Sequence, residues 1–279
     1  MIKIVTDSTG YLDEKFRKEN DITVVPLKVR FGDKSYREGV DITPDQFYKL
    51  LEESKELPKT SQPSIQDFTD VYKRILDEGN EILSIHISSK LSGTFNAARM
   101  AAEHLGTDKI KLIDSQHTSM ILVFLAEHAL EEIKKGKSLE EVYESTKALV
   151  PKMITRFTFW DIKYLVQGGR ISKAEGLIGS ILSIKPILSF TNGEVKTEAT
   201  PRTWKKALRK LAEYIEKINE ERGIEKIGII YGTNFDEAKE FANKVKERIG
   251  MDVRMQQLGA VVGTYAGPRW IGTGIQTRK

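Results

Sequence analysis

Residues 82–106 read ILSIHISSKLSGTFNAARMAAEHLG, which is an apolar run, a polar corner and an alanine-rich segment. The apolar run predicts a buried strand, and the spacing of apolar residues after the corner predicts a helix that ends near Leu105. The corner, residues 88–94, contains only one charged side chain, that of Lys90. It also carries four hydroxyl groups, those of Ser88, Ser89, Ser92 and Thr94.

The same order of strand, corner and helix recurs through the first half of the chain. A strand at 2–6 leads through a polar corner at 7–10 into a helix at 12–19. A strand at 109–114 leads into an apolar helix that reaches about Lys135. Alternation of strands and helices is typical of a parallel sheet with helices on its faces.

Helix start signals extend this pattern. Thr43 followed by Pro44 predicts one helix, and Ser64 three residues before Asp67 predicts another with a capping box. The apolar run 22–31 contains a proline, which indicates the end of a strand or an edge strand. We therefore expect an α/β domain with a parallel, Rossmann-like sheet over residues 1–155.

The second half of the chain has a different pattern. Residues 189–198, SFTNGEVKTE, predict a hairpin with Asn192 and Gly193 in its turn. Strands are predicted at 156–161, 226–232 and 252–259, and helices at 203–222 and 235–249. A hairpin beside helices favours a separate, smaller α+β domain over residues 156–279, with the change of pattern near Pro151.

Four loops of the first domain are rich in hydroxyl groups. Their sequences are TDST (6–9), TSQPS (60–64), SSKLSGT (88–94) and DSQHTS (114–119). Ligands of open parallel sheets bind where the strands end, so several polar loops at one edge indicate a site. Hydroxyls and backbone amides at helix starts suit a carboxylate or a phosphate. For Ser92 and Thr94 plain helix capping is an equal alternative, and for Ser64 capping is favoured.

Composition excludes several classes of protein. The chain has no cysteine, which excludes disulfides, thiolate catalysis and cysteine-bound metals. The net charge of +4 comes from basic and acidic residues mixed on helices, a pattern typical of solvated faces rather than of nucleic-acid binding. No apolar run approaches the roughly 20 residues of a membrane helix. The N-terminus lacks the apolar region of a secretion signal, so we expect a cytoplasmic protein.

Catalytic and nucleotide-binding motifs are also missing from the sequence. KKGKS (134–138) lacks the first glycine of a phosphate loop, and GTGIQT (272–277) ends in Thr where a dinucleotide motif needs Gly. The four histidines have no metal-ligand spacing, and we expect no metal and no catalytic residue. One alternative is a stand-alone hydrolase or phosphotransferase with Ser92 as nucleophile, although no motif supplies a base. Another is a structural or regulatory protein that binds nothing.

Seven segments in this order resemble the DegV family of bacterial fatty-acid-binding proteins along essentially the whole chain. They are IVTDSTGYL (4–12), VVPLKVRF (24–31), TSQPS (60–64), LSGTFNAA (91–98), IDS (113–115), GGRISKAEGLIG (168–179) with IKPIL (184–188), and GTYAGP (263–268). The resemblance implies an α/β domain packed on a smaller α+β domain. It also implies a long-chain fatty acid, such as palmitate, in a tunnel between them.

The resemblance assigns the ligand's carboxylate to hydroxyl donors. In the family, the Thr of TSQP and the Ser of LSGT bind it, and these are Thr60 and Ser92 here. The neighbouring Ser61, Gly93 and Thr94 complete the expected set in these loops. Tyr265 occupies a position at which the family has a histidine. Unlike the imidazole of histidine, the phenol of tyrosine cannot carry a positive charge. Arg269 and Trp270 stand where the family has small residues, so we expect a bulkier C-terminal loop.

The resemblance also implies a partner. Family members present the bound acid to a separate ATP-dependent fatty-acid kinase, which makes the acyl phosphate for phospholipid metabolism. Arg170 and Arg202 match basic positions linked with the phosphate and with docking of that kinase. On this reading the chain is a lipid-binding protein, the non-catalytic subunit of a fatty-acid kinase, with a fatty acid as ligand and no cofactor.

Overall fold

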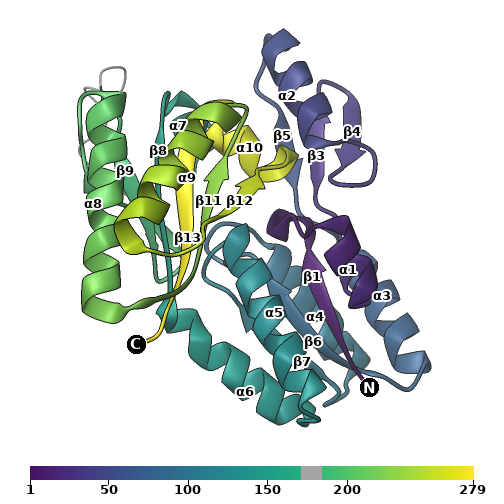
Figure 1. Ribbon diagram of the computed structural model, residues 1–279. Coiled ribbons are helices and arrows are strands. Elements are labelled where there is room, and N and C mark those ends of the chain that lie inside the picture. Colours follow the sequence, from purple (N-terminus) through teal and green to yellow (C-terminus); the bar gives the residue numbers. More distant parts are fainter. Residues whose placement is uncertain (171–183) are drawn as a thin grey trace. The chain divides into compact units, whose positions relative to one another are not determined.

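The computed structural model describes residues 1–170 and 184–279, which form two compact units (Figure 1). The first unit is Met1–Ile42 with Lys59–Pro151, and the second is Thr43–Pro58 with Lys152–Lys279. Each unit contains its own sheet or sheets and its own helices.

A four-stranded parallel sheet forms the centre of the first unit, in the order β2-β1-β6-β7. Its strands are β1 (Ile2–Asp7), β2 (Thr23–Val25), β6 (Glu81–His86) and β7 (Ile110–Asp114). Because all four run in one direction, the loops after Asp7, His86 and Asp114 leave from the same edge. The predicted parallel, Rossmann-like sheet is confirmed.

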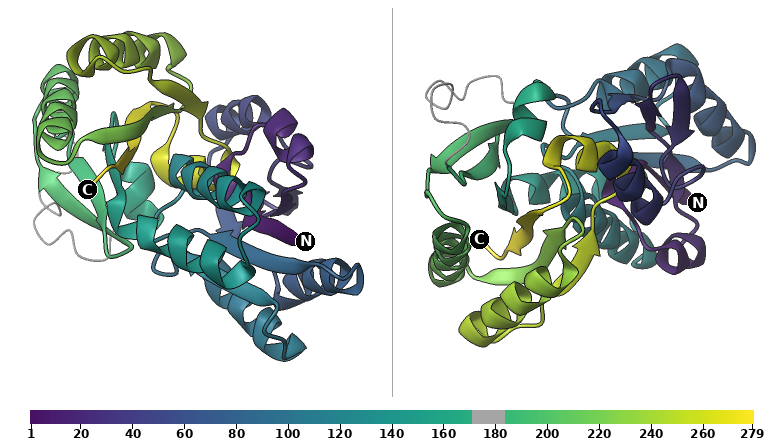
Figure 2. Two further views of the ribbon diagram at one scale, coloured as in Figure 1. Left: turned by 60° about the horizontal axis from the view of Figure 1, so that its bottom comes forward. Right: turned by 90° about the horizontal axis from the view of Figure 1, so that it is seen from above.

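Helices cover both faces of this sheet (Figure 2). Its helices are α1 (Glu14–Glu19), α3 (Ile65–Asp77), α4 (Thr94–Leu105), α5 (Met120–Lys134) and α6 (Leu139–Leu149). Along β6, Ile82 lies in a core cluster with residues of α3 and α4. Leu83 and Ile85 point to the opposite face, where α5 contacts the strand, and both are 0% exposed. The expected capping box of Ser64 and Asp67 starts α3.

A small antiparallel sheet completes the first unit, in the order β4-β3-β5. Its strands are β3 (Lys28–Phe31), β4 (Lys34–Arg37) and β5 (Lys59–Ser61). The apolar run 22–31 is therefore split between two sheets, because Pro26 cannot donate a ladder hydrogen bond and separates β2 from β3. The loop TSQPS begins inside β5, where Thr60 pairs with Val29.

The second unit is built on a six-stranded sheet in the order β10-β9-β8-β13-β11-β12. Its strands are β8 (Met153–Phe159), β9 (Ile187–Thr191), β10 (Glu194–Ala199), β11 (Ile224–Tyr231), β12 (Arg254–Gln257) and β13 (Trp270–Thr277). The predicted hairpin is β9-β10, with Asn192 and Gly193 at positive φ in its turn. Among these strands only β11 and β12 pair in parallel, so this is the mixed sheet of an α+β unit.

Five helices of the described residues belong to the second unit. They are α2 (Pro44–Glu53), α7 (Lys163–Gln167), α8 (Trp204–Arg222), α9 (Phe235–Ile249) and α10 (Ala260–Ala266). α8 and α9 share a core cluster with β11 and β13. α2 belongs here because Phe47 and Tyr48 pack against Gly263 of α10, where an added Cβ would lie 2.7 Å from the Phe47 ring. Within the described ranges no helix has the length and apolar character needed to cross a membrane.

Candidate functional site

Hydrogen bonds join the three polar loops at the carboxyl edge of the parallel sheet. The backbone N–H of Ser88 donates to the carbonyl of His117 over 2.8 Å, and that of Ser115 donates to His86 over 3.0 Å. The backbone N–H of Ser119 donates to the carbonyl of Thr9 over 2.9 Å. The loops that follow β1, β6 and β7 therefore form one connected surface.

The fourth loop reaches this surface through Gln62. Gly93 lies so close to the Gln62 side chain that an added Cβ would stand 2.0 Å from Oε1. Gln62 and Gly93 are thus in contact within the first unit, and this contact links the loop that contains Thr60 and Ser61 to the start of α4. Thr60 is half-buried and Ser61 is exposed.

The start of α4 carries the hydroxyls of Ser92 and Thr94, for which the sequence leaves open both helix capping and ligand binding. Ser92 Oγ lies 2.8 Å from Thr94 Oγ1 and accepts the backbone N–H of Thr94 over 3.3 Å. The N-cap residue, Gly93, has no side chain with which to cap the helix. Ser92 is partly exposed and Thr94 is fully buried. Ser64, by contrast, is committed to the capping box of α3, since its Oγ accepts the N–H of Asp67 over 3.1 Å.

The loop after β7 contains a buried hydroxyl that sequence reasoning did not single out. Thr118 is 6% exposed, and its Oγ1 has no hydrogen-bond partner among the described residues. Gln116 and Ser119, on either side, both have positive φ, which is costly for residues other than glycine. A buried donor left unpaired is also costly, so Thr118 is a further candidate for contact with a ligand. In the sequence, the only signal for Thr118 is its position in the hydroxyl-rich loop 114–119.

A fully buried chain of polar groups lies beneath these loops. His86 Nδ1 is 3.0 Å from Asp7 Oδ2, and His86 Nε2 is 2.7 Å from Ser84 Oγ. Ser84 Oγ in turn is 2.7 Å from the hydroxyl of Tyr72, and burial raises the pKa of that tyrosine. All four side chains are 0% exposed. The order Ser, His, Asp resembles a catalytic triad. Ser84, however, is closed off from solvent and hydrogen-bonded to Tyr72, so this chain of polar groups stabilises the core.

Ser92 has no comparable base. Among the residues that the structure describes, its hydroxyl bonds only to Thr94, and no histidine or carboxylate reaches it. The same residues contain no cluster of three or more histidine or acidic side chains that could hold a metal ion. The geometry therefore gives no support to Ser92 as a nucleophile.

Of the predicted site residues, Arg170, Arg202 and Tyr265 lie in the second unit. The structure brings Arg170 and Tyr265 together. The Arg170 guanidinium carbon is 4.5 Å from the centroid of the Tyr265 ring, a cation–π distance. Arg170 also donates from Nη1 to the carbonyl of Gly168 over 2.8 Å. Arg202 is exposed, just before α8. The rest of the motif that Arg170 belongs to, residues 171–179, lies outside the described residues.

The two bulky residues after Gly267 are built into the second unit. Arg269 binds the carboxylate of Glu237 from Nη2 over 2.9 Å, and its guanidinium carbon is 3.8 Å from the centroid of the Trp160 ring. Trp270 is 5% exposed and begins β13. These side chains anchor the C-terminal loop to α9 and to the residues after β8.

Replacement of Asp7 by alanine tests how the loops are held. Asp7 accepts hydrogen bonds from the backbone N–H of Thr9 and of Ile87, and both donors would be left buried and unpaired. We expect the Asp7→Ala variant to lose on the order of 3 kcal/mol of unfolding free energy in urea denaturation. Asp13→Ala is the matched control: Asp13 caps α1 at the surface with one backbone bond, so its loss should be about 1 kcal/mol. Equal losses in the two variants would contradict this role of Asp7.

Comparison with known proteins identifies the family to which the chain belongs. The family model described as "Uncharacterised protein, DegV family" matches residues 1–278. A DegV domain-containing protein of Clostridium acetobutylicum is 35% identical over 282 residues, which cover 100% of this chain and 98% of that protein.

Solved structures match this chain along essentially its whole length. A fatty-acid-binding DegV family protein of Streptococcus agalactiae has 30% identity and a TM-score of 0.92, covering 100% of this chain and 99% of that one. DegV of Bacillus subtilis, described as a fatty-acid-binding protein, has 31% identity and a TM-score of 0.90, with 99% of both chains covered. With this match of sequence and fold, the chain belongs to the DegV family.

Proposed function

We propose that this protein binds a long-chain fatty acid in a tunnel between the domains predicted at residues 1–155 and 156–279, with Thr43–Pro58 grouped with the second of them. The observation that carries the proposal is the resemblance, over the whole chain, to structures described as binding fatty acids. Besides the two above, these include a DegV family protein of Thermus thermophilus, with 30% identity and a TM-score of 0.89. The protein of Eubacterium ventriosum described as binding stearic acid has 28% identity and a TM-score of 0.89.

The acyl chain supplies the affinity in this proposal. Burial of a chain of about sixteen carbons is worth roughly 12 kcal/mol before the costs of ordering are subtracted. The carboxylate opposes burial by several kcal/mol unless donors replace its water. The tail therefore sets how tightly the ligand binds, and the head-group donors set which end of it lies at the polar loops.

The hydroxyl corner supports a head-group role. Ser92 and Thr94 sit at the start of α4, where free backbone N–H groups also favour an anion. Thr60 and Ser61 directly precede Gln62, whose side chain contacts Gly93. We propose that Thr60 and Ser92 donate to the carboxylate, with Ser61, Gly93, Thr94 and Tyr265 around it. Neutral donors would hold the acid without a fixed cation that resists its transfer.

Substitution of the two proposed donors separates head-group from tail binding. We expect Thr60→Ala and Ser92→Ala each to weaken palmitate binding about tenfold and to change binding of the matching fatty alcohol by less than about twofold. Ser64→Ala is the control, because that hydroxyl caps α3 and should leave both ligands unaffected. Displacement of a fluorescent fatty acid measures all the affinities. If acid and alcohol weaken together, these hydroxyls do not meet the carboxylate.

Tyr265 gives the proposal a pH signature. The DegV pattern carries a histidine at this position, and a histidine would gain a positive charge below about pH 6.5. We expect palmitate affinity of the natural chain to stay level between about pH 6 and 8. The Tyr265→His variant should bind about fivefold more tightly at the acidic end, because the imidazolium attracts the carboxylate. Tyr143→His on α6 is the control and should stay level. Because the Arg170 guanidinium lies against this ring and opposes a positive charge there, the decisive test is the double variant Tyr265→His, Arg170→Gln; a level profile for that variant would place Tyr265 away from the head group.

We also propose that the protein hands its ligand to an ATP-dependent fatty-acid kinase rather than acting as an enzyme itself. Arg202 is an exposed cation at the start of α8 and is available to a partner. We expect Arg202→Glu to slow acyl phosphate formation by such a kinase at least about tenfold, with palmitate affinity unchanged. Lys196→Glu, an exposed change on β10 of the same unit, should leave the rate unchanged. Acyl phosphate made from ATP without any kinase would contradict the proposal.

A further inference from the structure

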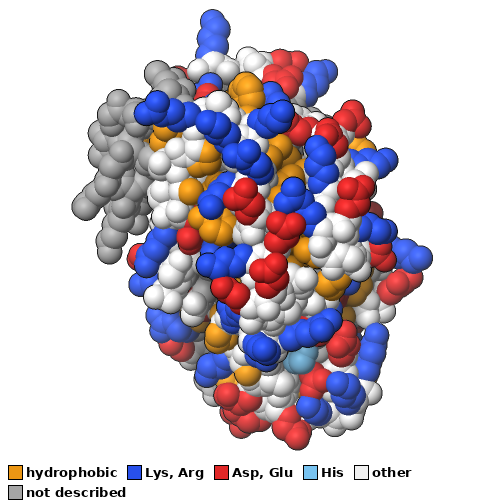
Figure 3. All heavy atoms as spheres, turned by 60° about the vertical axis from the view of Figure 1, so that its left-hand side comes forward, with side chains coloured by type: hydrophobic (Ala, Val, Ile, Leu, Met, Phe, Trp, Pro, Cys, Tyr) orange, Lys and Arg blue, Asp and Glu red, His pale blue; other side chains and the backbone are white. Residues whose placement is uncertain are grey.

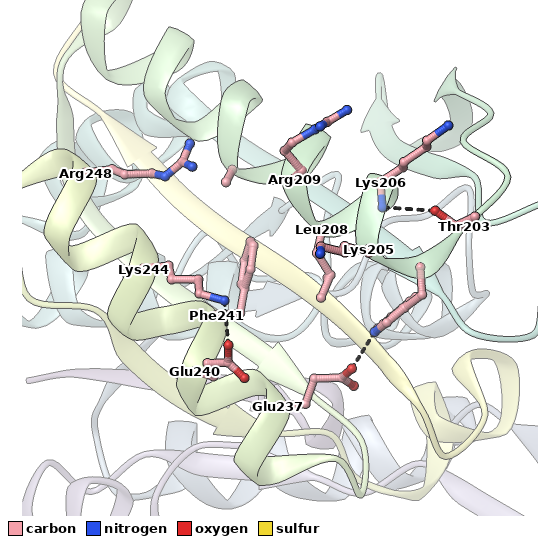
Figure 4. A pocket seen from close by; sticks show the side chains of 12 residues that line it. Thr203, Lys205, Lys206, Leu208, Arg209, Glu237, Glu240, Phe241, Lys244 and Arg248 are labelled. Atoms are coloured by element: carbon pink, nitrogen blue, oxygen red, sulfur yellow. Dashed lines mark hydrogen bonds and ion pairs between the residues drawn. The ribbon is translucent and has the colours of Figure 1, made fainter.

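A groove of about 740 Å³ runs between α8 and α9 in the second unit (Figure 4). Its floor is apolar and is formed by Leu208 and Ala212 of α8 and Phe241 of α9. Figure 4 shows the Phe241 ring between the two helices. On the side of the molecule brought forward in Figure 3, hydrophobic surface is visible between charged side chains. The groove is therefore apolar at its base and charged at its rim.

The carboxylates of the groove are already paired. Glu237 accepts hydrogen bonds from the Trp204 ring nitrogen over 2.6 Å and from Arg269 over 2.9 Å. Burial raises the pKa of Glu237, but the hydrogen bonds from Arg269, Asn234 and Trp204 outweigh it and lower that pKa overall. Glu240 pairs with Lys244 over 2.5 Å. Neither carboxylate is left to balance the remaining cations.

The cations of the α8 rim are largely without acidic partners. Lys205 and Lys206 line the groove and make no ion pair with any described residue. Arg209 lies 3.7 Å from Glu213, and both side chains are exposed, so solvent screens most of that attraction. Arg248, on α9, is paired with Glu216 over 3.0 Å. The excess positive charge is therefore concentrated on residues 205–209.

The shape of the groove distinguishes between possible occupants. Phe241 is 4% and Ala212 is 5% exposed, so the apolar floor is recessed. A flat bilayer needs apolar side chains that project, and none of the large exposed hydrophobic side chains among the described residues lines this groove. A helix can place its apolar side chains into such a recess. Glu237 and Arg248 are eleven positions apart on α9, which corresponds to about 16 Å, or three turns of a bound helix.

We propose that the α8–α9 groove binds an acidic amphipathic helix of a partner protein. Leucine-type side chains of that helix fill the recess above Leu208 and Phe241, and its carboxylates face Lys205, Lys206 and Arg209. None of the residues that line the groove is among those proposed to bind the fatty acid, so the proposal is independent of the fatty-acid proposal. Fatty-acid affinity therefore serves as an internal control.

A synthetic helical peptide tests this proposal with the full-length protein. The probe is a fluorescein-labelled peptide of about sixteen residues with leucine at positions i, i+3, i+4 and i+7, glutamate only at the positions that flank this leucine face, and alanine elsewhere to favour a helix. Fluorescence anisotropy should show binding that weakens as salt is raised. The combined variant Lys205→Glu, Lys206→Glu, Arg209→Glu should lose at least about tenfold in peptide affinity. Leu208→Ala should lower peptide affinity about threefold, because it removes apolar contact area from the floor of the groove. Both variants should bind palmitate as before.

A charge-matched variant and a membrane-binding assay decide the outcome. The variant Lys196→Glu, Lys217→Glu, Lys239→Glu makes the same change in net charge outside the groove and should bind the peptide normally. An equal loss in both triple variants would show only a general charge effect and would overturn the proposal. So would absence of peptide binding, or binding of vesicles containing phosphatidylglycerol that depends on Lys205, Lys206 and Arg209.

Discussion

The buried carboxyl group of Asp7 is the contact on which the polar edge of the parallel sheet depends. It accepts hydrogen bonds from the loop after β1 through Thr9 and from the end of β6 through Ile87 and His86. His86 then links to Ser84 and Tyr72, so the same carboxyl group is tied to α3 inside the core. A buried polar network of this kind is stable only when each member has a partner, and it then fixes one arrangement of the loops above it.

Apart from Lys90 and Asp114, those loops present hydroxyl groups and backbone amides rather than charges. The connected surface includes Ser92 and Thr94 at the start of α4 and, before α5, the hydroxyl of Thr118, which has no hydrogen-bond partner in the part of the chain that the structure describes. Such donors can replace the water around a carboxylate without adding a permanent ion pair. In the function proposed here, the chemistry of binding is thus divided: the acyl chain provides the free energy, and the loops provide orientation.

The strands and helices of the parallel sheet were predictable because their signals are local. The run 82–87, the corner after it and the capping pair of Ser64 and Asp67 each determine structure within a few residues. β13 was not predictable, since GTGIQT contains two glycines and no apolar alternation. All eight residues of β13 are nevertheless buried, because the strand pairs with β8 on one side and β11 on the other.

Long-range packing also limits what the sequence predicts about the site. The contact between Gln62 and Gly93 joins two loops thirty-one positions apart, and it depends on β5 pairing with β3. The stacking of Arg170 on Tyr265 joins residues on separate elements in the same way. The residue types of the site were recognisable from motifs, but their neighbours became visible only with the fold.

The most direct measurement for the central claim is native mass spectrometry of the purified chain under gentle conditions. The account predicts an added mass in the range of a long-chain fatty acid, with one acid bound per chain and released on denaturation. A protein that carries no such mass in repeated preparations, and takes up none when palmitate is supplied, would contradict the claim that this chain is a fatty-acid carrier.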